Sequence, residues 1–161
     1  MIVTEPPSRP EGEFPSLPKA ALSRFLARAQ KAVGLEGEVT VLLADDARLK
    51  ELNRGFRGKN KPTDVLSFPA FENADGLAGD LAISTETAQR QADEHGHALD
   101  VELRILMLHG ILHLAGHDHE ADDGEMRALE AELQAKLKLP TGLIERTLAP
   151  AKKAAKKRSA R

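Results

Sequence analysis

Three histidines at fixed offsets are the residues of this chain whose types and spacing are most suited to chemistry. They occupy positions 109, 113 and 119 in the run MLHGILHLAGHDH, residues 107–119. On a helix, His109 and His113 face the same side, so two imidazole nitrogens can reach one metal ion. Gly116 allows the chain to leave the helix and bring His119 back as a third ligand. Three protein ligands leave a fourth tetrahedral position for water, which is typical of catalytic zinc and indicates hydrolysis.

The residue after the first histidine argues against a protease. Zinc proteases with the same spacing carry a glutamate at that position, where it acts as the general base. This chain has Gly110 there. The spacing therefore predicts metal-dependent hydrolysis of another class of substrate.

Three further histidines lie inside this run or before it. His117 could replace His119 as a ligand, but its place just after Gly116 favours a substrate-facing or solvated role, and we assign it to substrate binding. His95 and His97 follow a polar helical segment, and we expect both at the surface.

Length and composition are those of an ordinary globular protein. The chain has 161 residues, of which 41% are hydrophobic and 30% charged, and we expect one catalytic domain over residues 1–149. About 13 proline-rich residues at the start are expected to be flexible. No apolar run approaches the roughly 20 residues of a membrane span and no signal-peptide core is present, so we expect a cytoplasmic protein. The absence of cysteine excludes disulfides and thiolate ligands, which leaves histidine and oxygen to hold a metal.

Positive charge is concentrated in two places. The tail, residues 150–161, has a charge of +6 and contains no acidic residue. Because the net charge of the whole chain is −2, the rest of the chain has a charge of −8. We expect the tail to be disordered, either gripping RNA or only aiding solubility. The second place holds Arg54, Arg57, Lys59 and Lys61, which we interpret as a loop because glycines interrupt it. Its position in an acidic molecule makes it a natural docking place for phosphate.

Hydrophobic periodicity predicts an α+β fold, a small mixed β-sheet packed with helices. One buried central helix carries the metal-binding histidines. The expected elements are a helix over 17–33 ending at Gly34, a strand over 39–44, a helix from Asp45 or Asp46 through Leu52, a hairpin of strands 64–71 and 79–84, a polar helix from Ser84 or Thr85 to near Gly96, the central helix 101–115 capped by Asp100, and a last helix from Asp122 or Asp123 through Leu137.

Three segments in one order resemble the YbeY family of bacterial endoribonucleases. They are FRGKNKPTDVLSF at 56–68, Gly79-Asp80 before Ile83-Ser84, and HGILHLAGHDH at 109–119, and the resemblance covers roughly residues 38–140. It implies one zinc ion on His109, His113 and His119 and an essential arginine at Arg57. It also implies single-strand-specific cleavage in small-subunit ribosomal RNA 3′-end maturation and ribosome quality control, with ribosomal RNA and ribosomal particles as partners. Family members often carry tyrosine where this chain has His117, and the resemblance does not extend to the tail.

The chemistry of these residues is consistent with phosphodiester cleavage. A zinc ion on neutral imidazoles can bring bound water to a pKa of about 7, and Arg57 could neutralise the charge that grows on phosphate oxygens. Lys59 and Lys61 are expected to contact the substrate. Asp80 and Asp118 are candidates for orienting the ligands or moving a proton, although each could equally be a turn or capping aspartate.

Two other functions remain open at this stage. One is a zinc metalloprotease-like hydrolase. The other is a non-catalytic ribosome assembly factor whose zinc is structural, with Asp118 closing the coordination shell. The sequence leaves open the cleavage site, the oligomeric state and the physiological metal.

Overall fold

The computed structural model describes residues 1–5, 16–57, 64–71, 75–118 and 121–140, without the side chains of Phe56 and Arg57. In chain order its elements are β1 (Ile2–Thr4), α1 (Lys19–Val33), β2 (Glu38–Ala44), α2 (Asp46–Arg57), β3 (Val65–Pro69), β4 (Leu77–Ser84), α3 (Thr85–His95), α4 (Leu99–Leu114) and α5 (Glu125–Lys136). Within these residues, no helix has the length and apolar character needed to cross a membrane. The expected basic tail, 150–161, lies outside the described residues.

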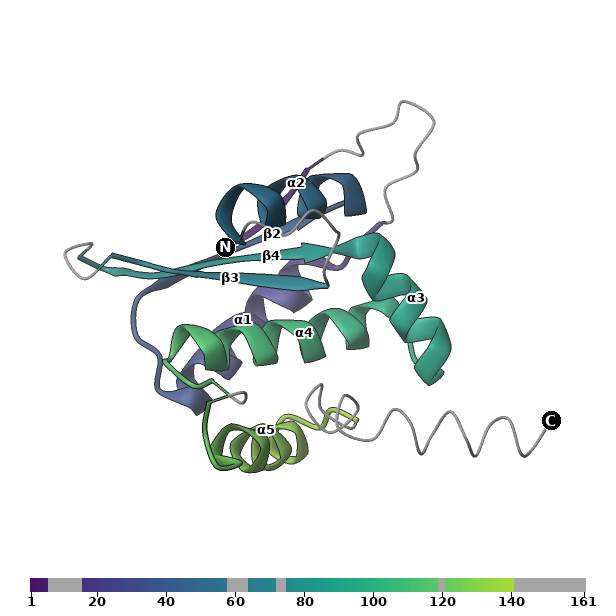
Figure 1. Ribbon diagram of the computed structural model, residues 1–161. Coiled ribbons are helices and arrows are strands. Elements are labelled where there is room, and N and C mark those ends of the chain that lie inside the picture. The colour runs from purple at the N-terminus through teal and green to yellow at the C-terminus, as the bar shows by residue number, and fades with distance from the viewer. Residues whose placement is uncertain (6–15, 58–63, 72–74, 119–120, 141–161) are drawn as a thin grey trace.

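A mixed four-stranded sheet organises the fold. Its order is β1-β2-β4-β3, with β1, β2 and β4 parallel and β3 antiparallel to β4 at the edge. Pro69 lies on that edge strand, as expected for a residue that cannot donate a ladder hydrogen bond. Figure 1 shows α2 on one face of the sheet and α1 and α4 on the other, with α5 beyond α4. The predicted α+β class is confirmed.

Two hydrophobic cores separate these layers. The larger core joins α1, α4 and α5 to the sheet through side chains such as Phe25, Leu81 and Met107. The smaller core packs Leu49 of α2 on Leu66 and Ala82 at the opposite face. Because neighbouring residues of a strand point to opposite faces, β4 contributes Leu81 to one core and Ala82 to the other.

The predicted buried central helix is confirmed in α4. Its side chains are buried around most of the circumference, and it contacts α1, α3, α5, β3 and β4. Asp100, which we expected as its cap, lies inside the first turn instead, because the helix begins at Leu99 after Ala98. An acidic residue in that turn still interacts favourably with the positive end of the helix dipole.

Two expectations about local structure were wrong. Among the first 13 residues, expected to be flexible, Ile2–Thr4 instead form β1, which pairs with β2, and the Met1 ammonium donates to the Val39 carbonyl at 2.7 Å, while residues 6–13 lie outside the described residues. The basic segment expected as a loop begins as helix, because α2 continues through Gly55 to Arg57. A single glycine costs a helix only about 1 kcal/mol, and one apolar face of α2 packs on the sheet.

A hydrogen-bonded cluster joins the first turns of α2 and α3, where β2 and β4 end. Ser84 accepts from the Thr87 backbone N–H and donates to the Asp46 carboxylate, which also accepts from Thr87 and Arg90. Partial burial raises the pKa of Asp46, but the hydrogen bonds from Ser84, Thr87 and Arg90 and the Arg90 charge outweigh it, so the pKa is lowered. The predicted capping roles of Ser84 and Asp45 are confirmed, since Asp45 accepts from the Arg48 N–H at 2.9 Å.

Close approach of α4 to the sheet yields a stability prediction. A Cβ at Gly110 would lie 2.6 Å from Leu81 Cδ2, whereas a Cβ at Gly55 of α2 would meet nothing within 4 Å. Gly55→Ala should stabilise the protein by roughly 0.5–1 kcal/mol through helix propensity. Gly110→Ala should destabilise it, because overpacking costs about 1–3 kcal/mol and outweighs the same gain. Denaturant unfolding of both variants measures the difference, and equal stabilisation would show that Leu81 moves aside.

Candidate functional site

The side chains of His109 and His113 converge on one side of α4. Their Nε2 atoms are 3.1 Å apart, and the two rings meet edge to face with centroids 4.7 Å apart. Two Zn–N bonds of about 2.0–2.1 Å at a tetrahedral angle place their nitrogens about 3.3 Å apart. The separation of the two nitrogens is therefore close to the one that a shared divalent metal ion requires.

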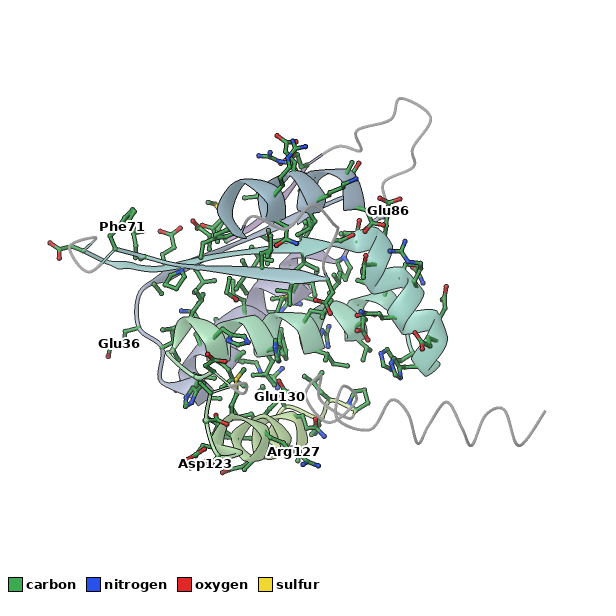
Figure 2. The ribbon with its side chains drawn as sticks, viewed as in Figure 1. Glu36, Phe71, Glu86, Asp123, Arg127 and Glu130 are labelled. Atoms are coloured by element: carbon green, nitrogen blue, oxygen red, sulfur yellow. The ribbon has the colours of Figure 1, made fainter. Side chains whose placement is uncertain are left out.

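A buried carboxylate supports the first of these histidines. Glu130 of α5 places Oε2 2.8 Å from His109 Nδ1, and both side chains are buried. Figure 2 shows Glu130 on the side of α5 that faces α4, while Asp123 and Arg127 lie on the outer side. Histidines that bind metals commonly donate their second N–H to such a group.

Glu130 was missed in the sequence, although a signal was present. It lies four residues after Met126 and three before Leu133, both of which are buried, so it belongs to the inner stripe of the last helix. A carboxylate on an apolar stripe must find a partner, because an unpaired buried charge is costly. Pairing it with a histidine on another helix required the packing of α5 on α4.

The chain leaves α4 at Gly116, as the sequence predicted. Gly116 has a φ of 98°, and the His117 N–H donates to the Leu112 carbonyl at 3.1 Å, a pairing typical of a glycine-terminated helix. His117 is half-buried just after this turn. His119, the expected third ligand, lies outside the described residues, which contain no group of three metal-binding side chains.

Two aspartates accept hydrogen bonds from backbone N–H groups in the connection from this turn to α5. The Asp118 carbonyl accepts from the N–H groups of Ala121 and Asp122. The Asp122 carboxylate then accepts from the Met126 N–H at 2.9 Å, although the residue before α5 is Gly124. Asp122 therefore satisfies the start of α5, as expected of one of the two aspartates.

The two carboxylates proposed to orient the ligands are placed differently from Glu130. Asp80 is exposed, and it alternates along β4 with Leu81, so it points to the α2 face of the sheet, away from α4. The structure does not bring Asp80 to the histidines. Asp118 is exposed in the turn after α4, and its role remains a prediction.

The basic residues fall on or after α2. Arg57 is the last residue of that helix, and Lys59 and Lys61 lie outside the described residues. Lys50 and Arg54 are exposed one turn apart and line a shallow hollow with Ala47 and Glu51. Neither has an ion pair with another described residue, whereas Arg48 pairs with Glu5 and Glu51.

The expectation that His97 lies at the surface was wrong. Its Nε2 is 2.6 Å from Oε1 of Glu102, a fully buried residue in the first turn of α4. His95 stacks beside it with ring centroids 6.1 Å apart. A buried carboxylate needs a partner, and hydrophobic periodicity did not identify His97 as the partner of Glu102.

Packing also explains the residue that argued against a protease. Gly110 faces the sheet, where Leu81 fills the space that a side chain would need. The Ser67 hydroxyl of β3 approaches the Gly110 carbonyl at 3.4 Å. A glutamate at this position would collide with the sheet rather than reach the metal-binding side of α4.

Comparison with known proteins places this chain among a well-defined group. The family model described as Endoribonuclease YbeY matches residues 10–138. A protein of Koribacter versatilis named Endoribonuclease YbeY is 63% identical over 138 residues, covering 86% of this chain and 90% of the relative. One of the same name from Solibacter usitatus is 53% identical over 131 residues, covering 81% and 87%.

A solved structure shares the fold. The solution structure of TM1509 from Thermotoga maritima superposes with a TM-score of 0.54 at 29% sequence identity. The match covers 85% of this chain and 89% of the other. The arrangement of sheet and helices therefore recurs in a protein of distant sequence.

Proposed function

This chain belongs to the YbeY family of endoribonucleases, and from that premise we propose that it cleaves single-stranded RNA at a zinc centre held by His109, His113 and His119. The observation that carries the metal centre is the 3.1 Å separation of the two Nε2 atoms, with Glu130 behind one of the rings. The resemblance of the third motif supports His119 as the remaining ligand.

We further propose that the substrate is ribosomal RNA. The motif resemblance implies action at the 3′ end of the small-subunit RNA and in ribosome quality control, with ribosomal particles as partners. The reaction would then take place in the cytoplasm, where these particles assemble. The basic tail, 150–161, would add electrostatic attraction to RNA or serve solubility alone.

Each chemical task of the proposed reaction is assigned to a residue of this chain. When bound, the metal supplies Lewis-acid charge and lowers the pKa of the water that it contacts. Arg57 stabilises the negative charge that develops on phosphate oxygens during cleavage, because a guanidinium donates two parallel hydrogen bonds. Lys59, Lys61 and His117 hold the flanking RNA.

The two other functions make different demands. A protease needs a general base beside the first histidine, and Gly110 has no room for one against Leu81. A structural zinc would need a fourth protein ligand, for which Asp118 is the candidate. Coordination spectroscopy of the zinc-loaded protein separates these cases, because a catalytic site retains a water ligand.

One experiment tests the function directly. Purified protein of known metal content is incubated with single-stranded RNA, DNA of matched sequence and a peptide. We expect cleavage of RNA alone, abolished by a chelator and restored by zinc. Cleavage of the peptide, or RNA cleavage that persists unchanged in the His113→Ala protein, would refute the proposal.

His113→Ala should remove both zinc and RNA cleavage. A site without thiolate ligands has little affinity to lose, so two remaining ligands should not retain the ion. Chelation should lower the melting temperature of the parent protein and leave that of the variant unchanged, because bound metal stabilises the folded state. His95→Ala on α3 is the control and should keep its zinc. Stoichiometric zinc in the His113→Ala protein would exclude this residue as a ligand.

Arg57→Ala should lower kcat by on the order of 100-fold with metal content and folding intact, since its contact strengthens in the transition state. Arg57→Lys should recover only part of the rate, because an ammonium cannot make the planar two-point contact. Lys59→Ala and Lys61→Ala should raise KM instead. Single-turnover rates at saturating RNA measure the difference, and an unchanged rate for Arg57→Ala would assign it to RNA docking.

The exposed cations of α2 should contribute to RNA binding. Replacing Lys50 and Arg54 together by Ala should weaken binding of single-stranded RNA to the cleavage-deficient His113→Ala protein. It should also reduce the log-log salt slope by up to about 1.4, since each neutralised phosphate contributes about 0.7. Arg24 and Arg28 form a matched exposed pair one turn apart on α1, across the sheet (Figure 1), and their replacement should change neither quantity. Equal effects of both pairs would indicate only a general charge effect.

A further inference from the structure

We propose that Glu130 is a positioning residue, which fixes the tautomer and orientation of His109 so that Nε2 presents its lone pair to the metal. This inference rests on the proposed metal centre. It extends the functional site from α4 to α5, a helix to which neither the motifs nor the family resemblance assigned a role.

The hydrogen bond determines which nitrogen can bind. A neutral imidazole has one N–H donor and one acceptor nitrogen, and a carboxylate can only accept. With Glu130 Oε2 2.8 Å from Nδ1, the proton belongs on Nδ1 and the lone pair on Nε2. Nε2 is also the atom that lies 3.1 Å from His113 Nε2, so the nitrogen without the proton is on the side of the proposed metal position.

Burial makes this arrangement costly as a purely structural device. Glu130 is 2% exposed on a stripe that it shares with Met126 and Leu133. Replacing a buried charged pair by apolar side chains of similar size is often neutral or stabilising. Apolar residues at positions 109 and 130 together could therefore satisfy the packing of α5 on α4, and the polar pair supplies something that packing does not require.

Three other carboxylates near α4 are placed differently from Glu130. Asp80 points to the other face of the sheet, and Asp118 is exposed in the turn after α4. Glu102 is buried at the other end of α4, where it contacts His97. The packing of α5 on α4 brings Glu130 to the histidine side of that helix.

Three variants of the full-length protein separate positioning from packing. Glu130→Met places an apolar side chain of similar length on the stripe and removes the acceptor. Glu130→Gln keeps an acceptor oxygen without the charge. Glu132→Met changes an exposed glutamate two residues away and serves as the control.

The first measurement is the affinity of each protein for zinc alone, by competition with a chromophoric chelator. Glu130→Met should bind about 10–100-fold more weakly, as expected when an outer hydrogen bond to a ligand is lost. Its metal-free melting temperature should fall, because the buried His109 N–H loses its acceptor, so the affinity is measured at a temperature where the variant is folded. Glu130→Gln should retain most of the affinity, and Glu132→Met all of it. Parent-like affinity in Glu130→Met would overturn the inference.

The second measurement needs no variant. Nitrogen chemical shifts of the neutral His109 ring in the metal-free parent should show the proton on Nδ1, and a proton on Nε2 would overturn the inference even if Glu130→Met failed to fold. The two proposals fail separately. A parent that binds no zinc refutes the metal centre, whereas a parent that binds zinc as tightly as Glu130→Met refutes only the role of Glu130.

Discussion

Contact between α4 and the sheet is the constraint on which the rest of the structure depends. The helix approaches β4 so closely that Gly110 cannot carry a side chain without displacing Leu81. This contact fixes the rotation of α4 about its axis. His109, one residue before Gly110, and His113, three residues after it, then project from a side of α4 next to the one that faces the sheet. The two histidines therefore meet beside the sheet rather than beneath it.

Burial of α4 places two polar side chains, Glu102 and His109, in the core, and each contacts a side chain from outside the helix. His109 meets Glu130 of α5, and His97 meets Glu102 at the opposite end of the helix. These contacts carry a desolvation cost that apolar packing would avoid. At the His97 end the pair joins the α3–α4 turn to the helix, whereas at the His109 end it lies directly behind the proposed metal ligand.

The sheet lies between the cations of α2 proposed to bind RNA and the histidines of α4 proposed to hold the metal. Lys50 and Arg54 lie on α2, on one face, and the histidines lie on α4, on the other. Arg57 ends α2 and begins the basic segment that leads to the edge strand β3. The Asp46 cluster anchors the first turn of α2 to α3 and so holds this helix in place.

The sequence by itself determined what depends on nearby residues. The helix with two histidines on one side, the glycine end at Gly116 and the start of a helix at Ser84 or Thr85 follow from periodicity and local backbone geometry, and the structure confirms them. The three motifs also identified the family. Local patterns erred in the first strand, which is too short to stand out without its distant partner β2, and in the extension of α2 to Arg57, where packing outweighs the low helix propensity of Gly55.

Only the tertiary structure decided which distant groups meet. Asp80 and Glu130 are both carboxylates near apolar residues, and spacing cannot rank them as partners of His109. Strand alternation turns Asp80 to the α2 face, while packing of α5 on α4 brings Glu130 to 2.8 Å from the ring. The physical reason is that a sequence specifies the face on which a side chain lies within its own element. The element opposite that face is set by the burial of all apolar faces at once.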